Sequence, residues 1–142
     1  MRKILAVLLA LLLPACAAAP SSVWQSDPIE SRVGIHVVPN FGDDPTIYKP
    51  KISKEGVRAA LESVDWVNEF NQVVVVTSPG ISMEVGGSLN PQHGLSAVYR
   101  NRHKGVEAVT RDAPESIEQL EAILLAFLEP GDKWQDVQKF DP

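Results

Sequence analysis

Histidine and cysteine, two residue types that are common in active sites, are scarce in this chain, which has the histidines His36, His93 and His103 and a single cysteine, Cys16. No two of the histidines stand one or two helical turns apart, so a zinc site would need ligands from separate loops. His36 lies in a β-rich segment on the face opposite Val37, where a hydrogen-bonded or solvent-facing side chain is the simpler interpretation. Neither a glycine-rich phosphate loop nor a nucleophile elbow is present. The sequence therefore predicts no enzyme, no metal and no cofactor.

A cluster of basic residues is the clearest candidate for binding chemistry. Arg100, Arg102, His103 and Lys104 follow Tyr99 on an expected turn between two strands. Side chains on such a hairpin tip are expected to project together and offer a positive contact to an acidic protein surface. The alternative is a tip that is merely kept soluble by its charges.

A second candidate contact is the loop over residues 86–94. It begins with two glycines and carries Asn90, Gln92 and His93. Loops of this kind often hold binding residues, although a simple connection between strands has the same composition.

The first fifteen residues have the three parts of a secretory signal. Arg2 and Lys3 form a basic start, an apolar run follows over residues 4–13, and small residues come next. A bilayer-spanning helix needs about 20 apolar residues, roughly twice the length of this run. We therefore interpret residues 1–15 as a signal peptide.

Cys16 stands where a lipid anchor would require it. Leu13-Pro14-Ala15-Cys16 resembles the lipobox of bacterial lipoproteins, although Pro14 departs from the small or hydroxyl residue that is usual at that position. The resemblance implies that the thiol takes up a diacylglycerol and that the chain is anchored through acyl chains such as palmitate. Ala17 after the cysteine favours, by the same analogy, the outer membrane facing the periplasm. An ordinary secretory signal cut near Ala17 or Ala18 is the alternative.

The charge of the chain limits its partners. It has 13 Lys+Arg and 18 Asp+Glu, and loss of Arg2 and Lys3 with the signal would leave 11 against 18, a net charge of −7. Such an acidic chain is a poor ligand for nucleic acid and for anionic lipid headgroups. Residues 16–31 lack periodicity and are expected to be a flexible tether, and residues 32–142 suit a single domain. Without a cysteine, this domain has no internal disulfide.

The periodicity of the domain predicts both strands and helices. Strands are expected over residues 33–38, 73–76, 81–85, 95–99 and 106–109, with a loop over residues 41–50. Ser53 is a candidate N-cap for a helix that ends near Asp65, and Asp112 with Glu115 form a candidate capping box for a second helix. That second helix stops at Pro130-Gly131, and Trp134 and Phe140 are expected to fold back onto the core.

These elements predict an α+β fold. Consecutive strands with short connections are antiparallel, and two one-sided helices need a sheet face to cover. We expect an antiparallel sheet of four to five strands with both helices packed on one face.

The C-terminal half is similar to a group of small bacterial domains associated with toxin systems. The resemblance lies in Gly86-Gly87, the strand that ends at Tyr99-Arg100, the helix that opens at residues 116–120, and residues 125–134 at its end. Immunity proteins are common in that group. Together with the lipobox, this resemblance implies a membrane-anchored protein that binds another protein, with neutralisation of a toxin as one form of that role. A structural or accessory envelope lipoprotein without a toxin partner is the alternative.

Overall fold

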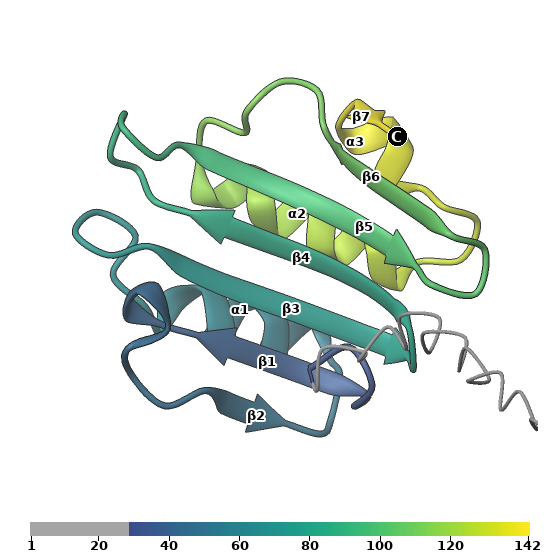
Figure 1. Cartoon of the computed structure of the whole chain (residues 1–142), viewed down its shortest axis with the longest axis horizontal. Helices are drawn as coiled ribbons and strands as arrows, with labels where there is room; N and C mark the ends of the chain where they lie inside the picture. Colours follow the sequence, from purple (N-terminus) through teal and green to yellow (C-terminus); the bar gives the residue numbers. More distant parts are fainter. Residues whose placement is uncertain (1–28) are drawn as a thin grey trace, which may run out of the picture.

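The fold is an antiparallel sheet with helices on one side, seen in a computed structural model that describes residues 29–142. The predicted signal peptide, Cys16 and most of the predicted tether lie outside the described residues. In the described part, seven strands have the spatial order β2-β1-β3-β4-β5-β6-β7, and every neighbouring pair is antiparallel (Figure 1). The strands are β1 (Gly34–Val38), β2 (Ile47–Lys49), β3 (Asn71–Ser78), β4 (Ile81–Gly87), β5 (Leu95–Asn101), β6 (Val106–Thr110) and β7 (Phe140–Asp141).

The helical segments are α1 (Lys54–Glu62), α2 (Ile117–Leu128), the short α3 (Trp134–Val137) and the single 3-10 turn η1 (Asn40–Gly42). Ser53 starts α1 as predicted, because its hydroxyl accepts a hydrogen bond from the Gly56 amide at 2.9 Å. Both α1 and α2 lie behind the sheet in Figure 1, on the same face. None of the helices in residues 29–142 has the length and apolar character needed to cross a membrane.

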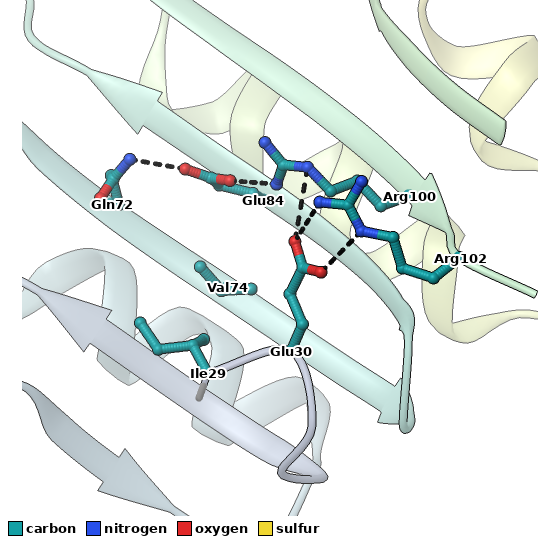
Figure 2. A pocket seen from close by; sticks show the side chains of 7 residues that line it. All are labelled: Ile29, Glu30, Gln72, Val74, Glu84, Arg100 and Arg102. Carbon is teal, nitrogen blue, oxygen red and sulfur yellow. Dashed lines mark hydrogen bonds and ion pairs between the residues drawn. The ribbon is translucent and has the colours of Figure 1, made fainter. Parts of the chain in front are cut away.

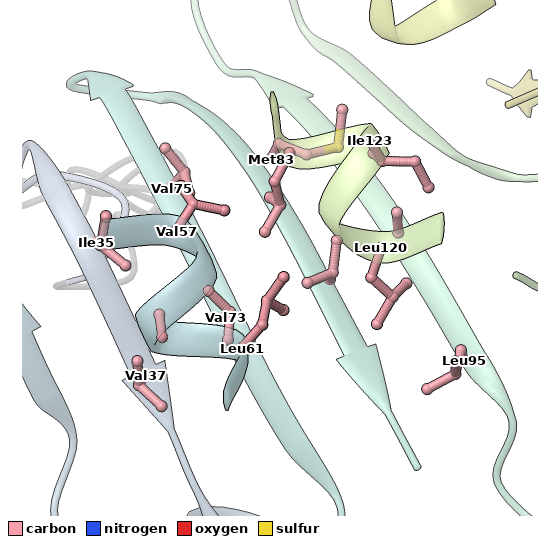
Figure 3. Close-up of a cluster of buried hydrophobic side chains, with 14 of the residues drawn as sticks. Ile35, Val37, Val57, Leu61, Val73, Val75, Met83, Leu95, Leu120 and Ile123 are labelled. Atoms are coloured by element: carbon pink, nitrogen blue, oxygen red, sulfur yellow. The ribbon is translucent and has the colours of Figure 1, made fainter. Parts of the chain in front are cut away.

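The core lies between these helices and the sheet. Alternate residues of β3 and β4 face the helices. Val73 pairs with Val85 and Val75 with Met83, at alternate positions of the register. All four side chains are fully buried. Leu61 of α1 and the α2 residues Leu120, Ile123 and Leu124 complete the same cluster (Figure 3).

The prediction of an α+β antiparallel sheet is confirmed, but the expected number of strands was too low. Two short edge strands complete the sheet: β2, inside the segment expected to be a loop, and β7, near the C-terminus. Trp134 is 2% exposed and Phe140 packs against the same core, as predicted. Gly86 and Gly87, expected in a loop, are the last two residues of β4.

The predicted capping box of the second helix was placed one turn too early. Ser116, not Asp112, is the N-cap of α2, and its hydroxyl accepts from the Gln119 amide at 3.2 Å. The Gln119 side chain in turn accepts from the amide of Glu115, the residue before the N-cap, at 2.6 Å, in an arrangement close to a capping box.

The packed part of the chain also extends further toward the N-terminus than the expected start at residue 32. Glu30, which the sequence places in the tether, is only 5% exposed. Its carbonyl accepts from the Gly80 amide at 2.9 Å, which ties this segment to the turn between β3 and β4.

Candidate interaction surface

The face of the sheet opposite the core is covered by neither α1 nor α2 (Figure 1). Two rows of facing residues cross it. One row consists of His36, Val74, Glu84, Val98 and Val109, and the other of Gly34, Val76, Ser82, Arg100 and Glu107. We call this the open face. Its mixture of valines with charged and hydroxyl side chains differs from the largely apolar face beneath the helices.

Arg100 is the centre of an ion-pair network on the open face. Its guanidinium bonds to Glu84 and lies 3.2 Å from the carboxylate of Glu107 and 3.5 Å from that of Glu30 (Figure 2). Glu30 also receives two hydrogen bonds from Arg102, at 2.8 and 3.0 Å. Such a paired, fork-like arrangement fixes both position and orientation.

Burial shapes the electrostatics of this network. The side chain of Arg100 is 19% exposed and that of Glu30 only 6%. Burial works against the charged form of Arg100, but the bond to Glu84 and the neighbouring carboxylates outweigh it and raise the pKa of Arg100 above its ordinary value. The hydrogen bonds to Glu30 likewise raise the pKa of Arg102. Both arginines therefore remain charged at any physiological pH.

A hollow of about 300 Å³ opens beside the network. It is lined by Ile29, Glu30, Gln72, Val74, Glu84, Arg100 and Arg102 (Figure 2). Gln72 donates to Glu84 at 2.6 Å and closes the chain of bonds. The arginines are already matched by glutamates of the same domain, so the hollow is a polar depression with little free positive charge.

The residues of the predicted cationic tip do not all meet. Tyr99 is on the core side of the sheet, where its ring stacks on Trp134 with the centroids 4.4 Å apart. Arg100 and Arg102 are engaged in the network, and the His103 ring bonds to the Pro79 carbonyl at 2.7 Å. Lys104 is exposed at the turn. Partner binding by these five residues remains a prediction, and the pairing of its arginines makes the tip less positive than its sequence suggests.

His36 is nearly buried at 3% exposure, and its ring bonds to the Arg32 carbonyl at 2.7 Å. The ring of Tyr48 lies 4.8 Å away, which packs the histidine between its neighbours on the open face. Across residues 29–142, no three His, Cys, Asp or Glu side chains are grouped so that they could hold a metal ion.

Aromatic residues from three separate segments form a second feature, at the end of the sheet that is leftmost in Figure 1. The rings of Phe41, Phe70 and His93 lie 5.8 to 5.9 Å from one another, centroid to centroid. They line a hollow of about 430 Å³ together with Val38, Gly42 and Gln72. The 86–94 loop, predicted as a contact surface, contributes only His93 to it, and the phenylalanines were not predicted.

A buried amide holds two of these segments together. The side chain of Asn71 is fully buried, donates to the carbonyls of Asp65 and Glu69, and accepts from the Asn40 amide at 3.0 Å. Asn40 and Phe41 have φ angles of +50° and +56°, a region that a bulky residue such as phenylalanine seldom adopts. These bonds therefore maintain an unfavourable backbone conformation beside the aromatic hollow.

Comparisons with protein-family models, with curated proteins and with solved structures found no match to this chain.

Proposed function

We propose that this chain is a lipoprotein of the cell envelope whose domain binds another protein. Residues 1–16 support the anchor, because a signal-like segment ends at the only cysteine in the chain. The same pattern and Ala17 support a location at the outer membrane, facing the periplasm.

The aromatic hollow at one end of the open face, with the exposed ring of Phe41, is the observation that carries the binding role. One face of the sheet is sealed by two helices. The other carries two hollows, and its exposed side chains are at the β6 edge, whereas His36, Val74, Val76 and Ser82 are at most 5% exposed. Protein contacts characteristically combine exposed aromatic anchors with a polar rim. The resemblance of residues 86–134 to immunity-type domains supports a toxin as the protein that is bound.

Affinity capture of the full-length lipoprotein tests this function. A C-terminal tag would be used to isolate the chain from gently solubilised envelopes, and mass spectrometry would identify stoichiometric companions. The matched control is residues 1–28 fused to an unrelated folded domain, which retains the anchor signal and lacks the sheet. We expect a discrete protein with the lipoprotein and none with the control. Equal recovery from both would contradict a binding role for the domain and favour an accessory lipoprotein.

A further inference from the structure

Three loops meet at the end of the sheet that carries the aromatic hollow. They comprise residues 40–44, 65–70 and 88–94, and we call them the loop end. Backbone hydrogen bonds of 2.7 Å join them, from the Phe41 amide to the Phe70 carbonyl and from the Leu89 amide to the Trp66 carbonyl. Together with the buried Asn71, these bonds hold three distant parts of the sequence together at this end of the sheet.

The loop end exposes large apolar side chains. Phe41 is 56% exposed, Val67 62% and Leu89 42%, and one comes from each loop. A group of such side chains on joined loops is a feature of interaction sites. The left-handed backbone at Phe41 adds to this, because it holds an aromatic ring outward at an energetic cost.

The charges around this surface all have one sign. Asp43, Asp44, Asp65 and Glu69 lie on the loops, and neither residues 33–48 nor residues 59–99 include a lysine or an arginine. A second hollow, of about 550 Å³, is lined in part by Asp44, Asp65 and Glu69 and adjoins the aromatic one through neighbouring residues of the chain. The arginines of the open face lie toward the other end of the sheet, beside the β3–β4 turn.

We infer that the loop end binds a basic surface of another folded protein, with an arginine or lysine of that protein seated in the aromatic hollow. Cations are attracted to the faces of aromatic rings within about 6 Å, and surrounding carboxylates strengthen that attraction. Phe41, Val67 and Leu89 would provide the apolar contact around the seated cation. This inference rests on the proposed function and specifies where the partner binds and what charge it has.

The network around Arg100 is the competing location, and its composition makes it less suitable. Its two arginines are matched by three glutamates of the same domain, and Glu30 is nearly buried. A partner would have to break existing pairs there, whereas the carboxylates of Asp43 and Asp44 are exposed.

Site-specific photo-crosslinking in intact envelopes separates the two locations. A photoreactive amino acid would replace Phe41 or Leu89 at the loop end, and Lys104 or Val109 elsewhere, in the full-length lipoprotein. We expect adducts from positions 41 and 89 with one protein, which mass spectrometry would identify and whose surface would be basic. Three outcomes would each overturn the inference: adducts only from positions 104 and 109, adducts with a second copy of this chain, or adducts with an acidic protein.

Binding measurements with the identified protein then test the chemistry. We expect Phe41→Ala and Leu89→Ser each to weaken binding by about tenfold, as loss of a central apolar anchor does. Asp44→Asn combined with Glu69→Gln should weaken binding by roughly fivefold at low salt and by less at high salt, because rim charges are screened. Lys104→Glu is the matched control and should leave affinity within about twofold. Thermal unfolding would verify that each variant is folded, and Leu89→Ser avoids the strained backbone at Phe41.

The outcomes for the function and for the location are distinguishable. No companion in the affinity capture would end the proposed function itself. Alternatively, a partner protein is captured and binds with unchanged affinity to Phe41→Ala, to Leu89→Ser and to the carboxylate variant. That result would support the proposed function but place the binding site elsewhere.

Discussion

At the scale of single residues, the pairing of Arg100 and Arg102 decides what the cationic segment can do. Arg102 and Glu30 are 72 residues apart in the sequence and form two hydrogen bonds. Through this pairing, two arginines that would give an exposed turn its positive charge instead hold the N-terminal segment against the open face. The main contribution of the two arginines is therefore to hold the N-terminal segment in place, and they add little positive charge to the turn.

Removal of Arg100 should destabilise the domain strongly. Arg100→Met leaves the carboxylate of Glu84, whose side chain is 16% exposed, without its cation, whereas Glu30 keeps its hydrogen bonds from Arg102. Loss of one partner of a largely buried pair costs about 3 kcal/mol or more. Arg111→Met is the control, because its pair with Asp141 is about half exposed on both sides and should contribute little to stability. Urea unfolding followed by tryptophan fluorescence measures both changes, and equal losses would contradict the difference in burial.

Asp65 should make the stability of the domain depend on pH in the acid range. Hydrogen bonds from the Asn68 side chain and from the Asn68 and Val67 amides hold the pKa of Asp65 below its ordinary value. Because the folded-state pKa is the lower one, this stabilisation is present above the unfolded-state pKa of about 4 and is lost as pH falls through the folded-state value.

The test is the free energy of unfolding between pH 5 and pH 2 for the native chain and for Asp65→Asn. The variant should show a smaller decline as pH falls, since one titrating group has been removed. Asp141 has a similarly lowered pKa through its bonds with Arg111 and titrates in both proteins, so the comparison isolates Asp65. Superimposable pH profiles would mean that the Asp65 bonds do not favour its charged form in solution.

At the scale of the elements, α2 shows what periodicity can predict. Its apolar stripe identified the helix and the face that packs on the sheet, and Leu124 is fully buried. Leu124→Ala should therefore cost about 2–5 kcal/mol, the range for a leucine removed from a packed core. Ala122→Ser lies on the exposed side of the same helix and should change stability by less than about 0.5 kcal/mol. Chemical denaturation of the two variants measures both losses of stability. Similar losses would mean that the buried face of α2 has been assigned wrongly.

Features that depend on local pattern were predictable, and those set by distant contacts were not. Strand β3 and the Ser53 cap follow from branched residues and helical spacing within a few positions. By contrast, β2 has three residues and β7 only two, and they are strands because the neighbouring β1 and β6 offer them edges. For α2, both Asp112 with Glu115 and Ser116 with Gln119 match a capping box, and only the packed helix distinguishes them.

The same limit applies to the candidate surface. Phe41, Phe70 and His93 come from three loops, and no spacing in the sequence relates them. Likewise, the basic residues within 100–104 predict a positive tip only if Glu30 belongs to the tether. In the structure Glu30 pairs with Arg102 and offsets that charge.

At the scale of the whole molecule, the proposal requires that the domain be held at a membrane. Cys16→Ser should abolish incorporation of a palmitate analogue in growing cells, because the thiol is the acyl acceptor in the proposed lipidation. Ala17→Asp is the matched control, since it leaves the cysteine in place and should remain labelled. Gel fluorescence after conjugation of a dye to the analogue measures incorporation. An unlabelled native chain would end the lipoprotein proposal and favour an ordinary secretory signal.

The attachment of Glu30 beside the β3–β4 turn has a mechanical consequence. The N-terminal segment joins the sheet at the end where β1 begins, and the loop end lies where β1 stops, just before Phe41. In the proposed anchored form, a pull between membrane and partner would run along the strands. Hydrogen bonds between antiparallel strands are perpendicular to that direction. Tension would load those between β1 and its neighbours in shear, so that they resist together and do not open one by one.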